Sequence, residues 1–109
     1  MLVATYNCNS LKRTARLDYI LHIFADYGIV MLQGSCIKAK PGIPVEARRV
    51  GNFYCIEAGW STSPNNKAGV MVCINTTKIP RSSIKYLQYP TQPHLMGRFL
   101  GVRILTRQM

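Results

Sequence analysis

The order of apolar and polar segments at the start of the chain constrains its fold more than any other feature. Residues 2–6 form a short apolar run that ends at polar Asn7, and such a run predicts a buried strand. Residues 29–32 form a second run of this kind. Between the two, apolar residues at helical spacing predict one buried stripe of a helix, formed by Leu17, Ile20, Leu21 and Phe24. Strand, helix and strand over this length favour a crossover that places two parallel strands in one sheet.

The ends of the helix carry their own signals. Asn9 or Ser10 is expected to cap the N-terminus, because a side-chain oxygen there accepts a hydrogen bond from a free amide of the first turn. Gly28 is expected to end the helix, where a left-handed residue is favoured.

The rest of the chain alternates between apolar runs and loops. Residues 35–49 contain Pro41-Gly42 and Pro44 and are expected to form a loop. Further strands are predicted at 53–58, 70–75, 84–87 and 99–105, and the connection between the first two of these is short enough for a hairpin. The sequence predicts an α+β fold of the α/β sandwich type, mostly β with one main helix, in a single domain over residues 1–109.

Composition limits where the chain acts. At 109 residues it holds at most one small domain, and 48% apolar residues are too many for a disordered chain. No apolar run approaches the roughly 20 residues of a membrane span. The N-terminus lacks the basic segment of a signal peptide, so we expect an intracellular protein, the nucleus included, that is neither secreted nor bound to a membrane.

Positive charge is concentrated in the second half of the chain. Fourteen Lys and Arg oppose four Asp and Glu, a net charge of +10. Residues 58–109 contain seven of the basic residues and none of the acidic ones. Such a surface attracts polyanions and makes nucleic acid the first candidate partner. The alternative is that scattered basic residues only keep the chain soluble.

The scarcity of acidic residues restricts any metal chemistry. Magnesium prefers carboxylate oxygen, and the only charged ligands in the sequence are Asp18, Asp26, Glu46 and Glu57. The cysteines lack zinc-ligand spacing, and Cys55 and Cys73 lie in apolar runs that are typical of buried residues. His22 is expected on a solvated helix face, and His94 in a loop.

Four segments, in order, resemble the N-terminal half of a domain of the endonuclease/exonuclease/phosphatase superfamily. They are Thr5-Tyr6-Asn7 with Asn9-Ser10-Leu11, then Leu32-Gln33, then the stretch from Asn66 to Val72, and finally the stretch from Gly97 to Ile104. The chain is most similar to the endonuclease domains of non-LTR retrotransposons.

The resemblance implies a Mg²⁺-dependent hydrolase of phosphodiester or phosphomonoester bonds, that is, a nuclease-like fold. It assigns Asn7 to the metal site, although Asn7 is also a common residue for closing a strand. The family has Glu after Gln33, and this chain has Gly34. We therefore expect no metal ligand there and no bound Mg²⁺, with Glu57 as the one substitute to consider.

The remaining motifs of the family belong to its second half. We therefore expect a truncated domain that is inactive alone, with the C-terminal half as a partner, or a relic of a degenerate element. The alternative is a basic nucleic-acid-binding module without catalysis. Its expected contacts are Lys67, Arg81, Lys85 and Arg98, with Trp60, Tyr86 and Tyr89 as aromatic residues that stack on bases or merely line the rim.

Overall fold

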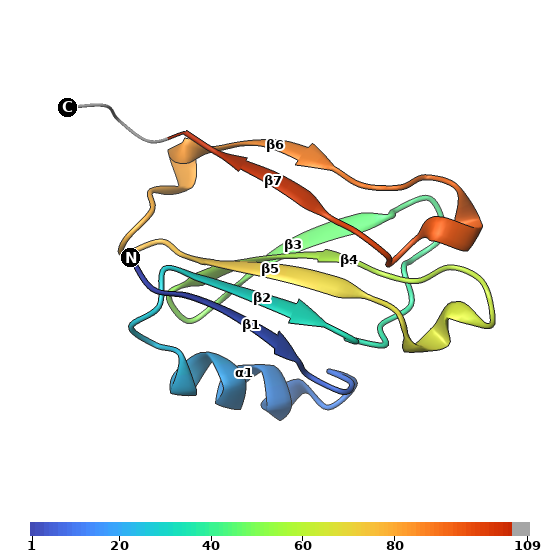
Figure 1. Cartoon of the computed structure of the whole chain (residues 1–109), viewed down its shortest axis with the longest axis horizontal. Helices are drawn as coiled ribbons and strands as arrows, with labels where there is room; N and C mark the ends of the chain where they lie inside the picture. Colours follow the sequence, from blue (N-terminus) through green and yellow to red (C-terminus); the bar gives the residue numbers. More distant parts are fainter. Residues whose placement is uncertain (106–109) are drawn as a thin grey trace.

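The computed structural model describes residues 1–105, except for the side chains of residues 14 and 86, so the predictions on residues 106–109 and on stacking by Tyr86 lie outside the described part. It consists of seven strands, one α-helix and three short 3₁₀ helices (Figure 1). In chain order these are β1 (Val3–Asn7), α1 (Thr14–Ile23), β2 (Ile29–Gln33), β3 (Val45–Val50), β4 (Phe53–Ala58), η1 (Asn65–Lys67), β5 (Val70–Asn75), η2 (Arg81–Ser83), β6 (Ile84–Gln88), η3 (Pro93–Leu95) and β7 (Gly101–Ile104).

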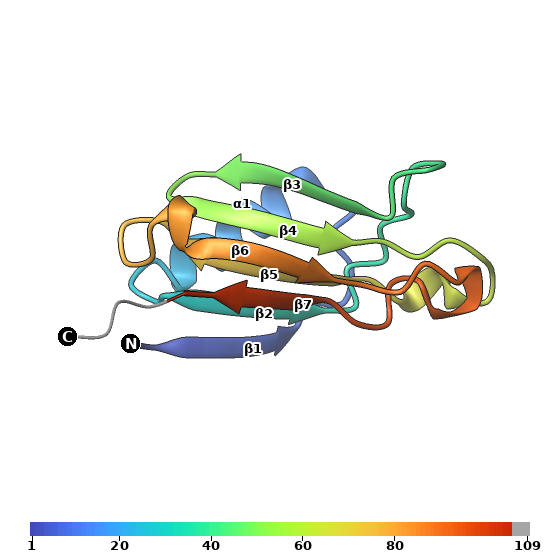
Figure 2. The same ribbon diagram turned by 90° about the horizontal axis from the view of Figure 1, so that it is seen from above.

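A five-stranded sheet forms the centre of the molecule. Its strand order is β1-β2-β5-β4-β3, and β6 and β7 form a separate two-stranded sheet. β1 and β2 are parallel, whereas the other neighbours in both sheets are antiparallel. The helix α1 covers one face of the large sheet and the β6–β7 hairpin lies over the other (Figures 1 and 2).

Each face of the large sheet has its own core, because successive side chains of a strand point to opposite faces. The helix side contains Leu17, Ile20 and Leu21 of α1, packed on Val30, Leu32, Cys55, Met71 and Cys73 of the sheet. The hairpin side contains Ile56, Ile74, Ile79 and Ile84, with Val102 and Ile104 of β7 packed against them.

The hairpin does not cover the whole of its face. Seen from above, β6 and β7 lie over the middle of the large sheet, and β1 extends beyond them (Figure 2). Val3 on β1 is accordingly 51% exposed and Met31 on β2 is 37% exposed.

The α+β organisation, mostly β with one main helix, is confirmed. The parallel β1–β2 pair and the antiparallel β4–β5 pair are confirmed as well. The prediction of an uninterrupted loop over residues 35–49 is wrong, because β3 begins at Val45. β3 was missed because its run of Glu, Ala and Arg lacks the apolar alternation of a half-buried strand.

Both predicted helix ends are wrong. The helix begins later, with Arg13 at the N-cap, because Asn9 and Ser10 adopt left-handed conformations at φ 52° and 90°. The Ser10 hydroxyl instead accepts a hydrogen bond from the amide of Lys12 at 3.2 Å. The helix ends at Ile23, and Gly28 begins the approach to β2, where its amide donates to the Leu2 carbonyl at 2.8 Å.

Asn75, at the end of β5, joins three segments of the fold. Its side chain is 2% exposed. Its amide donates to the carbonyls of Ala25 and Tyr27, both at 3.0 Å. Its side-chain oxygen accepts from the amide and the hydroxyl of Thr77. Asn75 therefore ties the turn after α1 to the central strand.

The substitution Asn75→Ala is expected to lower the free energy of unfolding by about 2 kcal/mol, because it removes the hydrogen bonds that the buried Asn75 side chain makes to Ala25, Tyr27 and Thr77. Urea denaturation measures the change. Asn52→Ala, at an exposed position in the β3–β4 turn, is the control and is expected to change stability by less than about 0.5 kcal/mol. Equal effects of the two substitutions would contradict the role assigned to Asn75.

Candidate functional site

The parallel strands β1 and β2 end side by side and bring Asn7 next to Gly34. Asn7 and Gln33 are register partners at the last position of the two strands. The amide of Gln33 donates to the Thr5 hydroxyl at 2.8 Å, which places these polar side chains on one face. Because ligand sites of α/β sheets lie at the carboxyl ends of their parallel strands, we call Asn7, Gln33 and Gly34 the candidate corner.

The backbone conformation and the hydrogen bonds of Gly34 leave little room for a side chain. It has φ +74°, a left-handed conformation that residues with a side chain rarely adopt. Its amide donates to the Gly69 carbonyl at 2.9 Å, and its carbonyl accepts from the amide of Ser10 at 2.7 Å. A Cβ atom at this position would lie 2.8 Å from Oδ1 of Asn7. A side chain at position 34 would therefore point at Asn7 and crowd it.

The residues of the corner do not fit a magnesium ion. They offer two side-chain amides and backbone carbonyls, and no carboxylate, although Mg²⁺ is held in proteins by at least one or two carboxylates. Within residues 1–105, no group of three or more His, Cys, Asp or Glu side chains lies close enough to hold a metal ion.

Glu57 does not lie at the corner, so the structure gives no support to its role as a substitute ligand. Its register partner on β5 is Met71, which pairs in turn with Leu32 on β2, and Leu32 with Tyr6. Glu57 is thus three strands away from β1. It also shares the helix-side face with Met71 and Leu32, whereas Asn7, one residue after Tyr6, points to the hairpin side.

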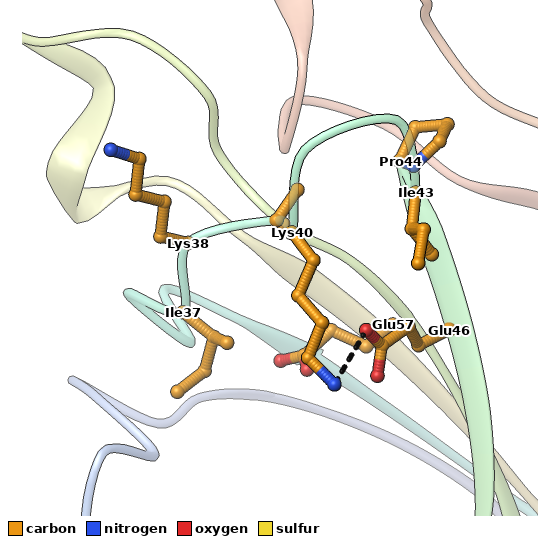
Figure 3. Close-up of a pocket in the computed structure, with 9 residues that line it drawn as sticks. Ile37, Lys38, Lys40, Ile43, Pro44, Glu46 and Glu57 are labelled. Atoms are coloured by element: carbon orange, nitrogen blue, oxygen red, sulfur yellow. Dashed lines mark ion pairs between the residues drawn. The ribbon is translucent and has the colours of Figure 1, made fainter.

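Glu57 instead lines two small cavities beside β3 and β4. One, of about 70 Å³, lies under the loop of residues 37–44 (Figure 3). The other, of about 260 Å³, extends to Lys12 and Arg48. Lys40 contacts Glu46 at 3.3 Å here, but both side chains are too exposed for this ion pair to contribute much stability.

The carboxyl group of Glu57 is held in an unfavourable environment. Burial raises its pKa above the ordinary 4.5, and the positive charge of the Arg48 guanidinium offsets this only in part. Oε2 of Glu57 and Oγ of Ser35 are both buried, and neither has a hydrogen-bond partner among the described residues. An ionised Glu57 therefore costs folding free energy.

The four basic residues expected to contact nucleic acid fall into two groups. Residues 65–67 and 93–98 lie at the end of the molecule toward which β1 points, beyond the last residue of that strand, whereas residues 81–85 lie at the opposite end (Figure 1). The loops with Lys67 and Arg98 therefore lie at the end of the molecule nearer the candidate corner. The segment with Arg81 and Lys85 lies at the far end. The structure therefore does not bring the four residues together in one place.

Partly buried polar contacts join the loops at the end of the molecule nearer the candidate corner. Arg98 donates to Oδ1 of Asn65 at 2.6 Å, and the Asn65 amide donates to the His94 carbonyl at 2.7 Å. The amide of Gly69 donates to the Gly97 carbonyl at 2.9 Å, so the loops that carry Lys67 and Arg98 join the loop after β2. Sequence reasoning missed Asn65, which lies in a polar loop and gives no signal of burial.

Of the aromatic residues considered for base stacking, Trp60 is engaged in contacts within the chain. The indole of Trp60 donates to the Cys36 carbonyl at 3.1 Å, with the Lys38 ammonium 5.4 Å from the ring centre. At the other end Arg81 lies 4.2 Å from the ring centre of Tyr54 and donates to its hydroxyl at 3.1 Å. Both cations therefore have aromatic partners within the chain.

Three of the four cysteines, Cys8, Cys55 and Cys73, are buried. Cys55 and Cys73 are buried register partners, as their apolar surroundings predicted. A hydrogen bond with Cys55, together with burial, raises the pKa of Cys73 far above its ordinary value. Burial also raises the pKa of Cys8. Thiols with raised pKa values are poor nucleophiles at neutral pH.

Comparison with known proteins gives no match: no family model, no curated protein and no solved structure is similar to the chain at a significant level. The resemblance to the endonuclease/exonuclease/phosphatase superfamily therefore stays a prediction. No described helix is both long enough and apolar enough to span a membrane.

Glu57→Gln is expected to stabilise the protein at pH 7 by on the order of 1 kcal/mol. Because the pKa of Glu57 is higher in the folded state, its carboxyl binds more protons there, and stability falls as pH rises above about 4.5. Urea denaturation at pH 4 and pH 7 measures this, and the gain should vanish at pH 4. The exposed neighbour variant Glu46→Gln is the control, and a destabilised Glu57→Gln protein at pH 7 would contradict the account.

Proposed function

We propose that the chain is the nucleic-acid-binding half of a phosphodiesterase-type domain, similar to the endonucleases of non-LTR retrotransposons, and that it does not cleave phosphodiester bonds on its own. The observation that carries this proposal is the candidate corner: a parallel strand pair ends in Asn7 on one strand and in Gln33-Gly34 on the next. The loops that carry Lys67 and Arg98 are joined to this corner through Gly69, which is hydrogen-bonded to both Gly34 and Gly97.

The inactivity follows from the chemistry of the corner. Phosphodiester cleavage of this type uses a divalent cation to stabilise the charge that develops on the phosphate. Gly34 provides no carboxylate, and Glu57 points to the other face of the sheet. The corner can offer hydrogen bonds to a phosphate through the amides of Asn7 and Gln33, but it has no means to hold Mg²⁺.

The positive charge of the chain supports nucleic-acid binding whether or not the chain belongs to a nuclease domain. A chain of +10 whose residues 58–109 contain no Asp or Glu is attracted to phosphate backbones at any sequence. This observation also favours the second candidate function, a basic nucleic-acid-binding module outside the nuclease family. The two proposals differ in the partner that they require. A half of a phosphodiesterase-type domain needs the C-terminal half of that domain, whereas a basic binding module does not.

Purified protein is expected to leave supercoiled plasmid intact in both Mg²⁺ and Mn²⁺. The physical reason is the missing carboxylate at position 34. Agarose electrophoresis of the nicked form measures the activity, with a protein-free incubation as the control. Nicking that saturates with Mg²⁺ and disappears in Asn7→Ala would overturn the proposed inactivity.

Binding of duplex and single-stranded DNA or RNA is expected to weaken steeply with salt. The double variant Lys67→Gln/Arg98→Gln should lower the slope of log affinity against log salt by about 1.4–1.8, since each lost phosphate contact removes about 0.7–0.9. Fluorescence anisotropy from 50 to 300 mM KCl measures it.

The matched control is Arg81→Gln/Lys85→Gln, which removes the same charge at the opposite end of the molecule. It is expected to change the slope by less than half as much. Equal losses in both variants would show that binding follows net charge alone and would overturn an interface at the corner. Affinity that does not depend on salt would overturn nucleic-acid binding by either candidate.

A further inference from the structure

The two edges of the large sheet differ sharply in charge. β3, at one edge, has the sequence Val-Glu-Ala-Arg-Arg-Val, and its charged side chains are of the kind that keeps an edge from pairing with another chain. β1, at the other edge, reads Val-Ala-Thr-Tyr-Asn and contains no charge and no proline. Among the described strands, β1 has a neighbour on one side only.

β1 is also only partly covered on its faces. All of its residues except Ala4 are exposed, although the strand is largely apolar. Around it lie further exposed apolar side chains, with Met1 75%, Leu2 55% and Met31 37% exposed. In the view from above, no element lies beyond β1 on that side (Figure 2). The most apolar edge of the sheet is thus its least protected one.

We propose that β1 is a pairing edge for a second copy of this chain, which adds its own β1 antiparallel across a twofold axis at Thr5. The direction of the peptide groups supports this register. The Leu2 carbonyl accepts from Gly28, and the Cys8 amide donates to Gln33. Since alternate residues of a parallel strand bond to their neighbour, the peptide groups of Val3, Thr5 and Asn7 point outward.

A twofold register at Thr5 uses all of these outward groups. Thr5 then faces Thr5 of the second copy, and Val3 faces Asn7. Each facing pair exchanges two hydrogen bonds in an antiparallel ladder, and threonine pairs across strands are favourable. Twofold registers centred on Ala4 or Tyr6 match fewer outward residues. Of the twofold registers, the one centred on Thr5 therefore pairs the most outward peptide groups of β1.

Pairing of β1 with β1 of a second copy is more favourable than pairing of β1 with β3 of successive copies. Pairing β1 with β3 of the next copy would repeat without closing and form a fibre, but the Glu and Arg side chains of β3 oppose it. Pairing β1 with itself closes the assembly at two copies. The net charge of +10 per chain does not prevent this, because charges beyond about 8 Å are screened at physiological salt.

Analytical ultracentrifugation from 1 to 300 µM tests the proposal. A strand of five residues gives an interface at the low end of the size range, so we expect a monomer–dimer equilibrium in the micromolar range. Hydrogen exchange should show concentration-dependent protection of the amides of Val3, Thr5 and Asn7. A protein that remains monomeric at 300 µM, or an assembly without such protection, would overturn the proposal.

Thr5→Pro removes an outward amide and should weaken the dimer at least tenfold. Its matched control, Thr5→Val, keeps the amide and the dimer. Proline is tolerated on an edge strand, and an unchanged far-ultraviolet circular dichroism spectrum verifies that the variant folds. If Thr5→Pro does not fold, Thr5→Lys, which places like charges across the axis, takes its place. A dimer unaffected by the variant, or β1 amides protected only by a different added polypeptide, would overturn the assignment to a second copy.

Discussion

The close approach of three loops at Gly69 determines where the candidate corner lies. Gly69 accepts hydrogen bonds from the amides of Gly34 and Ser35 and donates to Gly97. It has φ +121°, and a Cβ atom there would collide with the Ser35 hydroxyl. Only glycine permits both the conformation and the contact. Without it, the loop after β2 could not lie against β5, and Lys67 and Arg98 would not share the end of the molecule with Asn7.

The parts of the fold that the sequence predicts are those with strong apolar periodicity. The parallel pair, the helix stripe and the buried strands β4 and β5 belong to this class. β3 lies outside it, yet a signal was present: Gly51-Asn52, between residues 45–50 and 53–58, is a typical two-residue hairpin turn. The helix N-cap was mispredicted because Asn and Ser serve caps and left-handed turns equally well, and here the backbone at Asn9 and Ser10 is used for a turn.

The site was harder to predict than the fold because it depends on which face of the sheet a residue occupies. Glu57 is close in sequence to a strand end, as a metal ligand would be, but its position in β4 places it on the helix side. Asn75 and Asn65 are buried and structural, although Asn in an unknown sequence usually indicates a surface turn. The pairing of Lys67 with Arg98 at one end depends on glycine contacts between loops that are far apart in sequence.

The left-handed backbone at Gly34 disfavours an acidic side chain at the candidate corner. A glutamate at this position would have to adopt φ near +74°, and its Cβ atom would lie 2.8 Å from Oδ1 of Asn7. The strain of a left-handed conformation costs about 1–2 kcal/mol for a residue with a side chain. The Asn7 side chain would also have to turn away from that Cβ atom, while the hydrogen bond from the Gly34 amide to the Gly69 carbonyl holds the backbone in its left-handed path. In this chain, the geometry that joins the loop after β2 to Gly69 therefore favours glycine over an acidic residue at position 34.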